Sequence, residues 1–257
     1  MRFRLFGPDH LAALAVAAAL GAYLVRLVRR DPAGPGARAT RAVLAGALVA
    51  GLAVYFFHEA RRGPLSAWDV LPLQLCDFLI FLAVYALFTL RPLACELLYF
   101  WSVGTLLAMV TPDVPLGFPN WYFFTFFTLH GAVVVSAAVV VLGFRRTPGP
   151  GAARRAFLAL AAYAAVVGAV NQATGRNYLY LCRKPGEATL LDWLGPWPVY
   201  VLSGAALALG LFHLMAWPFA RRRAGPAAGD LRDRPGSARA GEGPARPTPP
   251  GRGRGDR

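Results

Sequence analysis

Charged residues are scarce in this 257-residue chain: they make up 16% of the sequence, whereas hydrophobic residues make up 56%. A typical soluble domain has about 25% charged residues. This shortage excludes an ordinary water-soluble globule and a disordered protein. Three cysteines are too few for a disulfide framework, and their spacing matches no zinc motif.

Acidic residues are also few, so the net charge is +14, a value that nucleic-acid-binding proteins often reach. The distribution of the charge argues against such a partner. Most basic residues lie between long apolar runs or in the C-terminal segment 221–257, as in membrane proteins. We therefore expect no nucleic-acid partner, and we interpret the chain as an integral, multi-pass protein of the cell membrane.

Seven apolar stretches are each long enough for a transmembrane helix, which takes about 20 mostly apolar residues. Proline and glycine separate them. They cover approximately residues 10–28, 42–60, 69–90, 92–111, 120–143, 155–174 and 197–219. The sequence therefore predicts an all-α fold: a polytopic membrane helical bundle of seven transmembrane helices, forming one domain over residues 1–220.

Basic residues flank the predicted helices unequally, with thirteen on one side and seven on the other. Because cytoplasmic loops are enriched in arginine and lysine, this bias predicts an external N-terminus and a cytoplasmic C-terminus. Residues 221–257 are mainly proline, glycine, alanine and arginine. Such a segment has too little apolar surface to form a core, so we predict a disordered cytoplasmic tail.

Polar residues inside the apolar runs gather at one end of the predicted bundle, which the expected orientation makes the outer end. Ionisable groups within the hydrocarbon cost about 2.5–3.5 kcal/mol each and usually face a bundle interior or a wet cavity. The gathering predicts an outward-facing polar cavity, although polar groups at helix ends are also typical of the membrane interface. The residues are His10, His58, Glu59, Asp69, Gln74, Cys76, Asp77, Asp113, Asn120, His130, Asn171 and Gln172.

Cys76, Asp77 and His130 are candidate catalytic residues because they lie deepest in this group. At about 1.5 Å per residue, Cys76 falls roughly 10 Å inside its predicted helix and His130 roughly 15 Å. A thiol and an imidazole at comparable depth provide a nucleophile and a general base. Asp77 or Glu59 would orient the imidazole, as the third member of a triad does. Alternatively, Cys76 is simply a small core residue.

Seven residues are predicted to bind substrate in this cavity. Three phenylalanines share a helical face with His130 and would form an apolar slot for an acyl chain; alternatively, they belong to an interfacial aromatic belt. Asn171 and Gln172, or else Asn120, would donate hydrogen bonds to an oxyanion. We expect the third, fifth and sixth helices to line the cavity together. The seven residues are Phe123, Phe126, Phe127, Asn171, Gln172, His58 and Glu59.

A set of short motifs resembles the YwaF-like family of bacterial integral membrane proteins across roughly residues 5–219. Gln74 stands where that family usually has histidine. The family is distantly similar to an animal polytopic phospholipid acyltransferase that works through a cysteine and a histidine. The resemblance implies Cys76 as the nucleophile that accepts the acyl group and His130 as the base. The motifs are Leu71–Phe78, Glu96–Trp101, Thr111–Asp113, Phe123–Gly131, Asn177–Tyr178, Lys184–Pro185 and Leu190–Pro198.

Two functional hypotheses follow from these residues. The first is a Cys/His-dependent acyltransferase or acyl hydrolase that acts on membrane phospholipids at an outer-leaflet site and requires no cofactor. The second is a non-enzymatic membrane protein that binds a small ligand or a metal ion in the outward-facing polar cavity. A structural bundle without chemistry is a third interpretation. Tolerance of a Cys76→Ser substitution would favour the second or third over the first.

Overall fold

A computed structural model describes residues 2–186 and 190–224 of the chain. Within these ranges the protein is helical and contains no strand, apart from an isolated bridge between Arg2 and Leu116. The all-α prediction is therefore confirmed. The remaining part of the predicted C-terminal tail, residues 225–257, lies outside the described residues.

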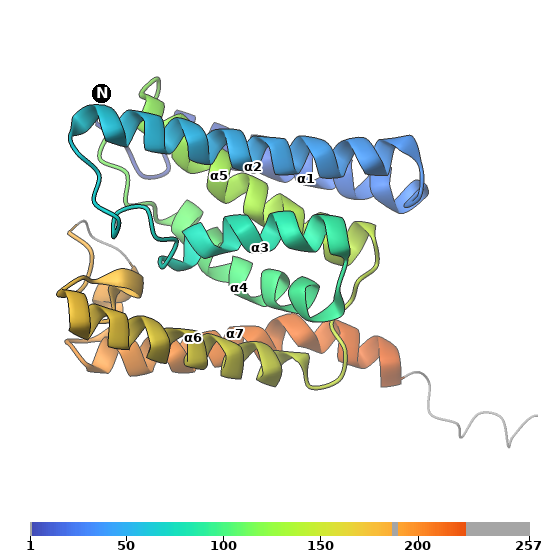
Figure 1. Cartoon of the computed structure of the whole chain (residues 1–257). Helices are drawn as coiled ribbons and strands as arrows, with labels where there is room; N and C mark the ends of the chain where they lie inside the picture. The colour runs from blue at the N-terminus through green and yellow to red at the C-terminus, as the bar shows by residue number, and fades with distance from the viewer. Residues whose placement is uncertain (1, 187–189, 225–257) are drawn as a thin grey trace, which may run out of the picture. The chain divides into compact units, whose positions relative to one another are not determined.

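Each predicted apolar run overlaps one α-helix, and successive helices run in alternating directions (Figure 1). Proline occupies the first turn of α1, α2 and α4. The lack of an N–H is harmless there, because N–H groups in the first turn make no hydrogen bond within the helix. A π-helix, Val139–Gly143, extends α5, and two short 3-10 helices, Tyr178–Tyr180 and Leu190–Leu194, lie between α6 and α7. The α-helices are α1 (Pro8–Arg30), α2 (Pro35–Arg62), α3 (Leu75–Thr89), α4 (Pro92–Val110), α5 (Trp121–Ala138), α6 (Ala152–Thr174) and α7 (Val199–Ala224).

Six of these helices are long and apolar enough to cross a membrane, and α3 is the exception in the part of the chain that the structure describes. With 15 residues, α3 is roughly 22 Å long, whereas the hydrocarbon layer is about 30 Å thick. The described chain is thus a membrane-type helical protein with six candidate spans and one shorter apolar helix.

The start of α3 corrects the prediction that a helix begins near residue 69. Pro72 disfavours helical geometry at the residue before it, and Asp69 accepts hydrogen bonds from the Ser66 backbone N–H (2.9 Å) and hydroxyl (2.6 Å). These contacts hold residues 66–69 in a turn instead of a helix. Cys76 therefore lies in the first turn of α3 rather than 10 Å inside it.

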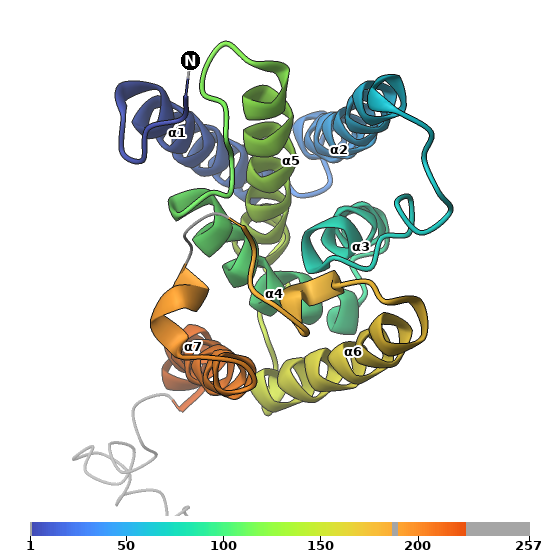
Figure 2. The same ribbon diagram turned by 90° about the vertical axis from the view of Figure 1, so that its left-hand side faces the viewer.

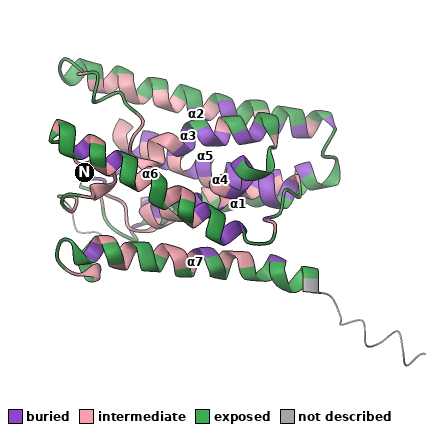
Figure 3. Ribbon diagram, turned by 60° about the horizontal axis from the view of Figure 1, so that its bottom comes forward, coloured by how far each residue is buried: buried purple, intermediate pink, exposed green. Residues whose placement is uncertain are grey.

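The centre of the bundle is formed by α4 and α5. Helix α5 packs against α1, α2, α3 and α4, while α4 also contacts α6. Figure 2 shows α5 between α1 and α2, and α4 between α5 and the pair α6 and α7. Many residues of α2 and α7 are exposed, as Figure 3 shows, and the exposed apolar side chains include Val43 of α2 and Leu202 of α7. Exposed apolar faces of this kind suit a lipid environment.

The two ends of the bundle are named by a residue that lies near each of them. We call the end that carries loops 63–74, 111–120 and 175–198 the Cys76 end, and the opposite end, with loops 31–34, 90–91 and 144–151, the Glu96 end. The predicted tail begins at residue 221, but α7 continues through three arginines to Ala224.

Candidate functional site

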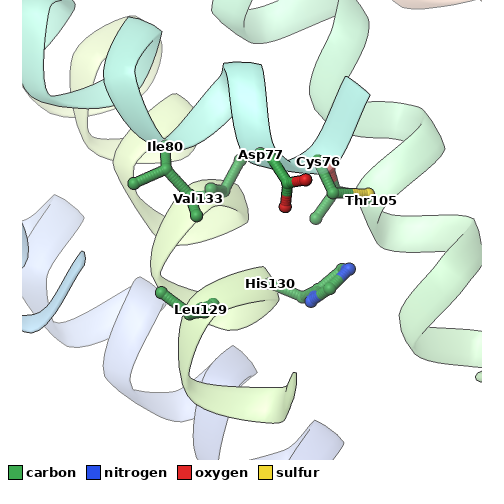
Figure 4. Close-up of a pocket in the computed structure, with 7 residues that line it drawn as sticks. All are labelled: Cys76, Asp77, Ile80, Thr105, Leu129, His130 and Val133. Carbon is green, nitrogen blue, oxygen red and sulfur yellow. The ribbon is translucent and has the colours of Figure 1, made fainter. Parts of the chain in front are cut away.

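A small cavity at the Cys76 end brings together residues from three helices. Its volume is about 20 Å³, which is sufficient for one water molecule or one carbonyl group. Figure 4 shows the Asp77 carboxyl and the Cys76 side chain above the His130 imidazole, with Thr105 beside Cys76. The lining residues are Cys76, Asp77 and Ile80 of α3, Thr105 of α4, and Leu129, His130 and Val133 of α5.

The N-terminus of α3 positions Cys76. The first hydrogen bond of this helix runs from the Phe78 N–H to the Gln74 carbonyl (3.0 Å), so the N–H groups of the three preceding residues have no acceptor within the helix. Gln74 occupies the N-cap without capping, because its side-chain oxygen accepts the Leu179 N–H at 2.8 Å instead. The uncapped N–H groups and the helix dipole place partial positive charge at this end of α3.

The imidazole of His130 has a defined tautomer. Its Nδ1 lies 2.9 Å from the Phe126 carbonyl, which can only accept, so we assign the ring proton to Nδ1. The lone pair of Nε2 is then available as a base. The Phe126 ring stacks on the imidazole with centroids 4.0 Å apart and an interplanar angle of 22°. The backbone carbonyl and this ring orient His130 without a carboxylate.

Two polar groups in the cavity have no hydrogen bond to a nitrogen or oxygen atom among the residues that the structure describes. The Thr105 hydroxyl is buried, with 1% of the residue exposed, and interacts with the Cys76 thiol. No hydrogen bond to the half-buried Asp77 carboxyl is seen within residues 2–186 and 190–224 either. Polar groups left unsatisfied in a membrane protein are costly and mark candidate functional positions.

Asn171 and Gln172 do not line this cavity, so the predicted packing is corrected: α4 contributes in place of α6. The Asn171 amide accepts the Tyr178 N–H (2.8 Å) and donates to the Tyr178 carbonyl (2.9 Å), which anchors the loop after α6. Gln172 is exposed. Asn120, the other predicted oxyanion donor, caps α5 by accepting the Tyr122 N–H. None of these amides faces Cys76 in the described cavity.

His58 and Glu59 also lie outside the cavity lining. The His58 ring stacks on Trp121 with centroids 4.2 Å apart, and Glu59 pairs with Arg62 at 3.0 Å. Glu59 therefore does not orient the His130 imidazole, and the Phe126 carbonyl does so instead.

The three predicted acyl-slot phenylalanines separate into two groups. Phe123 and Phe127 are buried in a cluster with Met109, packed against Phe3, where they fill space rather than line a slot. Only Phe126 borders the site, through its contact with His130. The predicted slot is thus reduced to one aromatic side chain.

The loop before α3 is ordered by an exposed polar network. Hydrogen bonds from Ser66 hold the pKa of the Asp69 carboxyl below its usual value, and the Arg176 guanidinium, 2.7 Å away, acts in the same direction. Tyr163 donates to the Leu73 carbonyl at 3.1 Å. These contacts connect loop 63–74 to α6 and the loop that follows it.

The sequence interpretation did not identify Thr105, which the structure places beside Cys76. A lone hydroxyl in an apolar helix gives no spacing signal, because threonine usually bonds to its own helix. A search of the described residues finds no group of three or more His, Cys, Asp or Glu side chains that could hold a metal ion. Of the other cysteines, Cys95 is buried and Cys182 is exposed.

The profile of the TMEM164 family matches residues 5–216, which include all of the cavity residues. This chain belongs to the TMEM164 family. An uncharacterised protein of Treponema pallidum (strain Nichols) is 30% identical to this TMEM164-family chain over 152 residues. That match covers 58% of this chain and 62% of the relative, so the chain spans less than two thirds of the relative's length. No solved structure matches the chain.

Proposed function

We propose that this TMEM164-family protein transfers acyl groups from membrane phospholipids through a thioester on Cys76. The observation that carries the proposal is the shared cavity, in which Cys76 stands at the uncapped start of α3 and His130 offers a free Nε2. A thiol at a helix N-terminus beside a neutral imidazole is the usual arrangement of a cysteine nucleophile.

In the first half of the reaction, the Cys76 sulfur attacks the carbonyl carbon of a lipid ester while His130 Nε2 takes the thiol proton. The new C–S bond forms, and the electron pair of the C=O double bond moves to oxygen. When this intermediate collapses, the ester C–O bond breaks and the lipid alkoxide takes the proton from His130. The products are an acyl-thioester on Cys76 and a lysolipid.

In the second half, a lipid hydroxyl or water attacks the thioester, and His130 takes its proton. Cys76 then leaves as the thiolate and is reprotonated by His130, so no cofactor is consumed. The Asp77 carboxylate lies in the same cavity and would stabilise the imidazolium that forms in both halves. Of the predicted substrate contacts, Phe126 would touch the acyl chain, and His58, Glu59 and Gln172 would face the headgroup.

The experiment offers purified protein a phospholipid carrying a radiolabelled acyl chain and measures label that neutral hydroxylamine releases from the protein. The wild type should form such a thioester. Cys76→Ser should not, because a hydroxyl is far less acidic than a thiol while the two side chains are similar in size. Cys182→Ser is the matched control and should label normally, since Cys182 is exposed and remote from the cavity lining.

Label that persists in Cys76→Ser would remove Cys76 from the mechanism. Tolerance of that substitution would favour the second hypothesis, binding of a small ligand without chemistry. The metal-binding form of this hypothesis has less support, because the described residues contain no suitable group of ligands.

We also propose seven crossings of the cell membrane, with α3 as the short one, an external N-terminus and a cytoplasmic C-terminus. In this topology residues 1–220 form the membrane domain and residues 221–257 follow it in the cytoplasm. The unequal number of basic residues at the helix ends supports this orientation. A reporter fused after residue 224 should be active only in the cytoplasm, and activity on the other side would reverse the topology.

A further inference from the structure

Hydroxyl side chains in this bundle generally form a hydrogen bond within their own helix. Six of them donate to the backbone carbonyl four residues earlier, at 2.6 to 3.2 Å, and Ser102 donates to the carbonyl three residues earlier. This bond is the usual way to satisfy a hydroxyl in an apolar setting. The side chains that do so are Thr40, Thr89, Thr111, Thr125, Ser136 and Thr174.

Thr105 departs from this pattern. Its hydroxyl oxygen is buried and has no hydrogen bond to a nitrogen or oxygen atom within the described part of the chain, although the Trp101 carbonyl lies four residues earlier; the group that interacts with it is the Cys76 thiol. It lines the cavity that holds Cys76 and His130. A hydroxyl whose one neighbouring polar group is the nucleophile itself can donate to an acceptor that enters the cavity.

The size and walls of the cavity suit a carbonyl oxygen as this acceptor. A volume of about 20 Å³ has room for one small group, such as a water molecule or a carbonyl oxygen. Ile80, Leu129 and Val133 make the rest of the lining apolar, which strengthens any hydrogen bond formed inside. The N-terminus of α3 adds uncapped N–H groups and partial positive charge at the same place.

We propose that Thr105 forms the oxyanion hole together with the backbone N–H of Cys76. When the Cys76 sulfur adds to a lipid ester, the carbonyl oxygen gains negative charge and accepts hydrogen bonds from the Thr105 hydroxyl and this N–H. Thr105 is then a catalytic residue, because it touches the reacting oxygen. This inference rests on the proposed acyl transfer and identifies the substrate group in the cavity as an ester carbonyl.

The test compares two reactions of the same thiol. Acylation by labelled phospholipid passes through an oxyanion, whereas alkylation by iodoacetamide is a direct displacement and does not. Thr105→Val keeps the shape and removes the hydroxyl. It should slow acylation of Cys76 about 10²–10³-fold, as expected for the loss of one oxyanion donor, and leave the alkylation rate within about twofold.

Two control variants sharpen the result. Thr105→Ser retains a hydroxyl and should recover most of the acylation rate. Thr125→Val makes the same change at a buried threonine whose hydroxyl donates to the Trp121 carbonyl outside the cavity, and it should acylate like the wild type.

Undiminished acylation of Thr105→Val would overturn this inference alone. An equal loss of acylation and alkylation would also overturn it, because Thr105 would then act on the thiol or on the packing around it. A wild type that is alkylated but never acylated would overturn the proposed function, and this inference with it.

Discussion

A carboxylate lies near each end of the bundle, Glu96 buried and Asp77 half-buried, and the two differ in their hydrogen bonds. At the Glu96 end, Glu96 accepts the Gly149 N–H (2.9 Å) and two hydrogen bonds from Arg155 Nη2 (2.9 Å each). At the Cys76 end, the Asp77 carboxyl has no hydrogen bond among the described residues. The first carboxylate joins α4 to α6 and the loop before it, whereas the second leaves its charge available to the cavity.

His10 and His130 show the same contrast in how many of their polar atoms are hydrogen-bonded. His10 is completely buried, and both ring nitrogens are used: Nδ1 accepts the Phe6 N–H at 3.0 Å, and Nε2 donates to the Met109 carbonyl at 2.8 Å. His130 uses one nitrogen and leaves the other open. In this bundle, a polar side chain whose hydrogen bonds are all made therefore indicates a structural role, and one that keeps an unused donor or acceptor indicates a functional site.

The largest expected effect separates the two histidines. His130→Ala should lower the acylation rate of Cys76 about 10²–10⁴-fold, as is typical for the loss of a general base. His10→Ala should instead lower stability by about 1–3 kcal/mol, because it leaves the buried Met109 carbonyl and the partly buried Phe6 N–H without their partner. Acylation rate and thermal unfolding in detergent measure the two effects. A large stability loss in His130→Ala with normal acylation would break the comparison.

A smaller effect separates the two carboxylates. Asp77→Asn should slow acylation about tenfold or more, because the imidazolium loses a neighbouring negative charge. Glu96→Gln should leave acylation of the folded protein unchanged and lower stability by about 1 kcal/mol. This cost is modest because the Arg155 side chain is 47% exposed and water screens the pair. If Glu96→Gln slowed acylation as much as Asp77→Asn, the difference in hydrogen bonding would not separate a structural carboxylate from a functional one.

The smallest effect concerns pH and the loop before α3. The folded protein holds the pKa of the Asp69 carboxyl below the unfolded value of 3.8, so its stabilising contribution is present above that value. It is lost as pH falls through the lower, folded-state pKa. Hydrogen-exchange protection of the Ser66 N–H should therefore be constant from about pH 7 to pH 5 and fall in stronger acid. In Asp69→Asn the acid-induced loss should be absent, and an unchanged profile would contradict the assignment.

The helices were predictable because long apolar runs bounded by proline and glycine leave few alternatives in a membrane. The start of α3 was not, since it depends on the Ser66–Asp69 turn and on contacts from α6 that hydropathy does not encode. Residue depth suggested that Cys76, Asp77 and His130 would lie together, and the structure brings them together. The depth of a residue along its helix does not show which helices are neighbours in the bundle, however. The sequence therefore predicted that α6 would line the cavity, where the structure has α4.

The short length of α3 has a consequence for the surrounding lipid. In the proposed topology α3 crosses the membrane, and a helix of roughly 22 Å is shorter than a hydrocarbon layer of about 30 Å, so the bilayer beside it would become thinner or its polar boundary would dip inward. Either deformation would bring the glycerol backbone of nearby phospholipids toward the first turn of α3. Hydrophobic mismatch would thus deliver ester bonds to the depth of Cys76, without requiring a lipid to leave its leaflet.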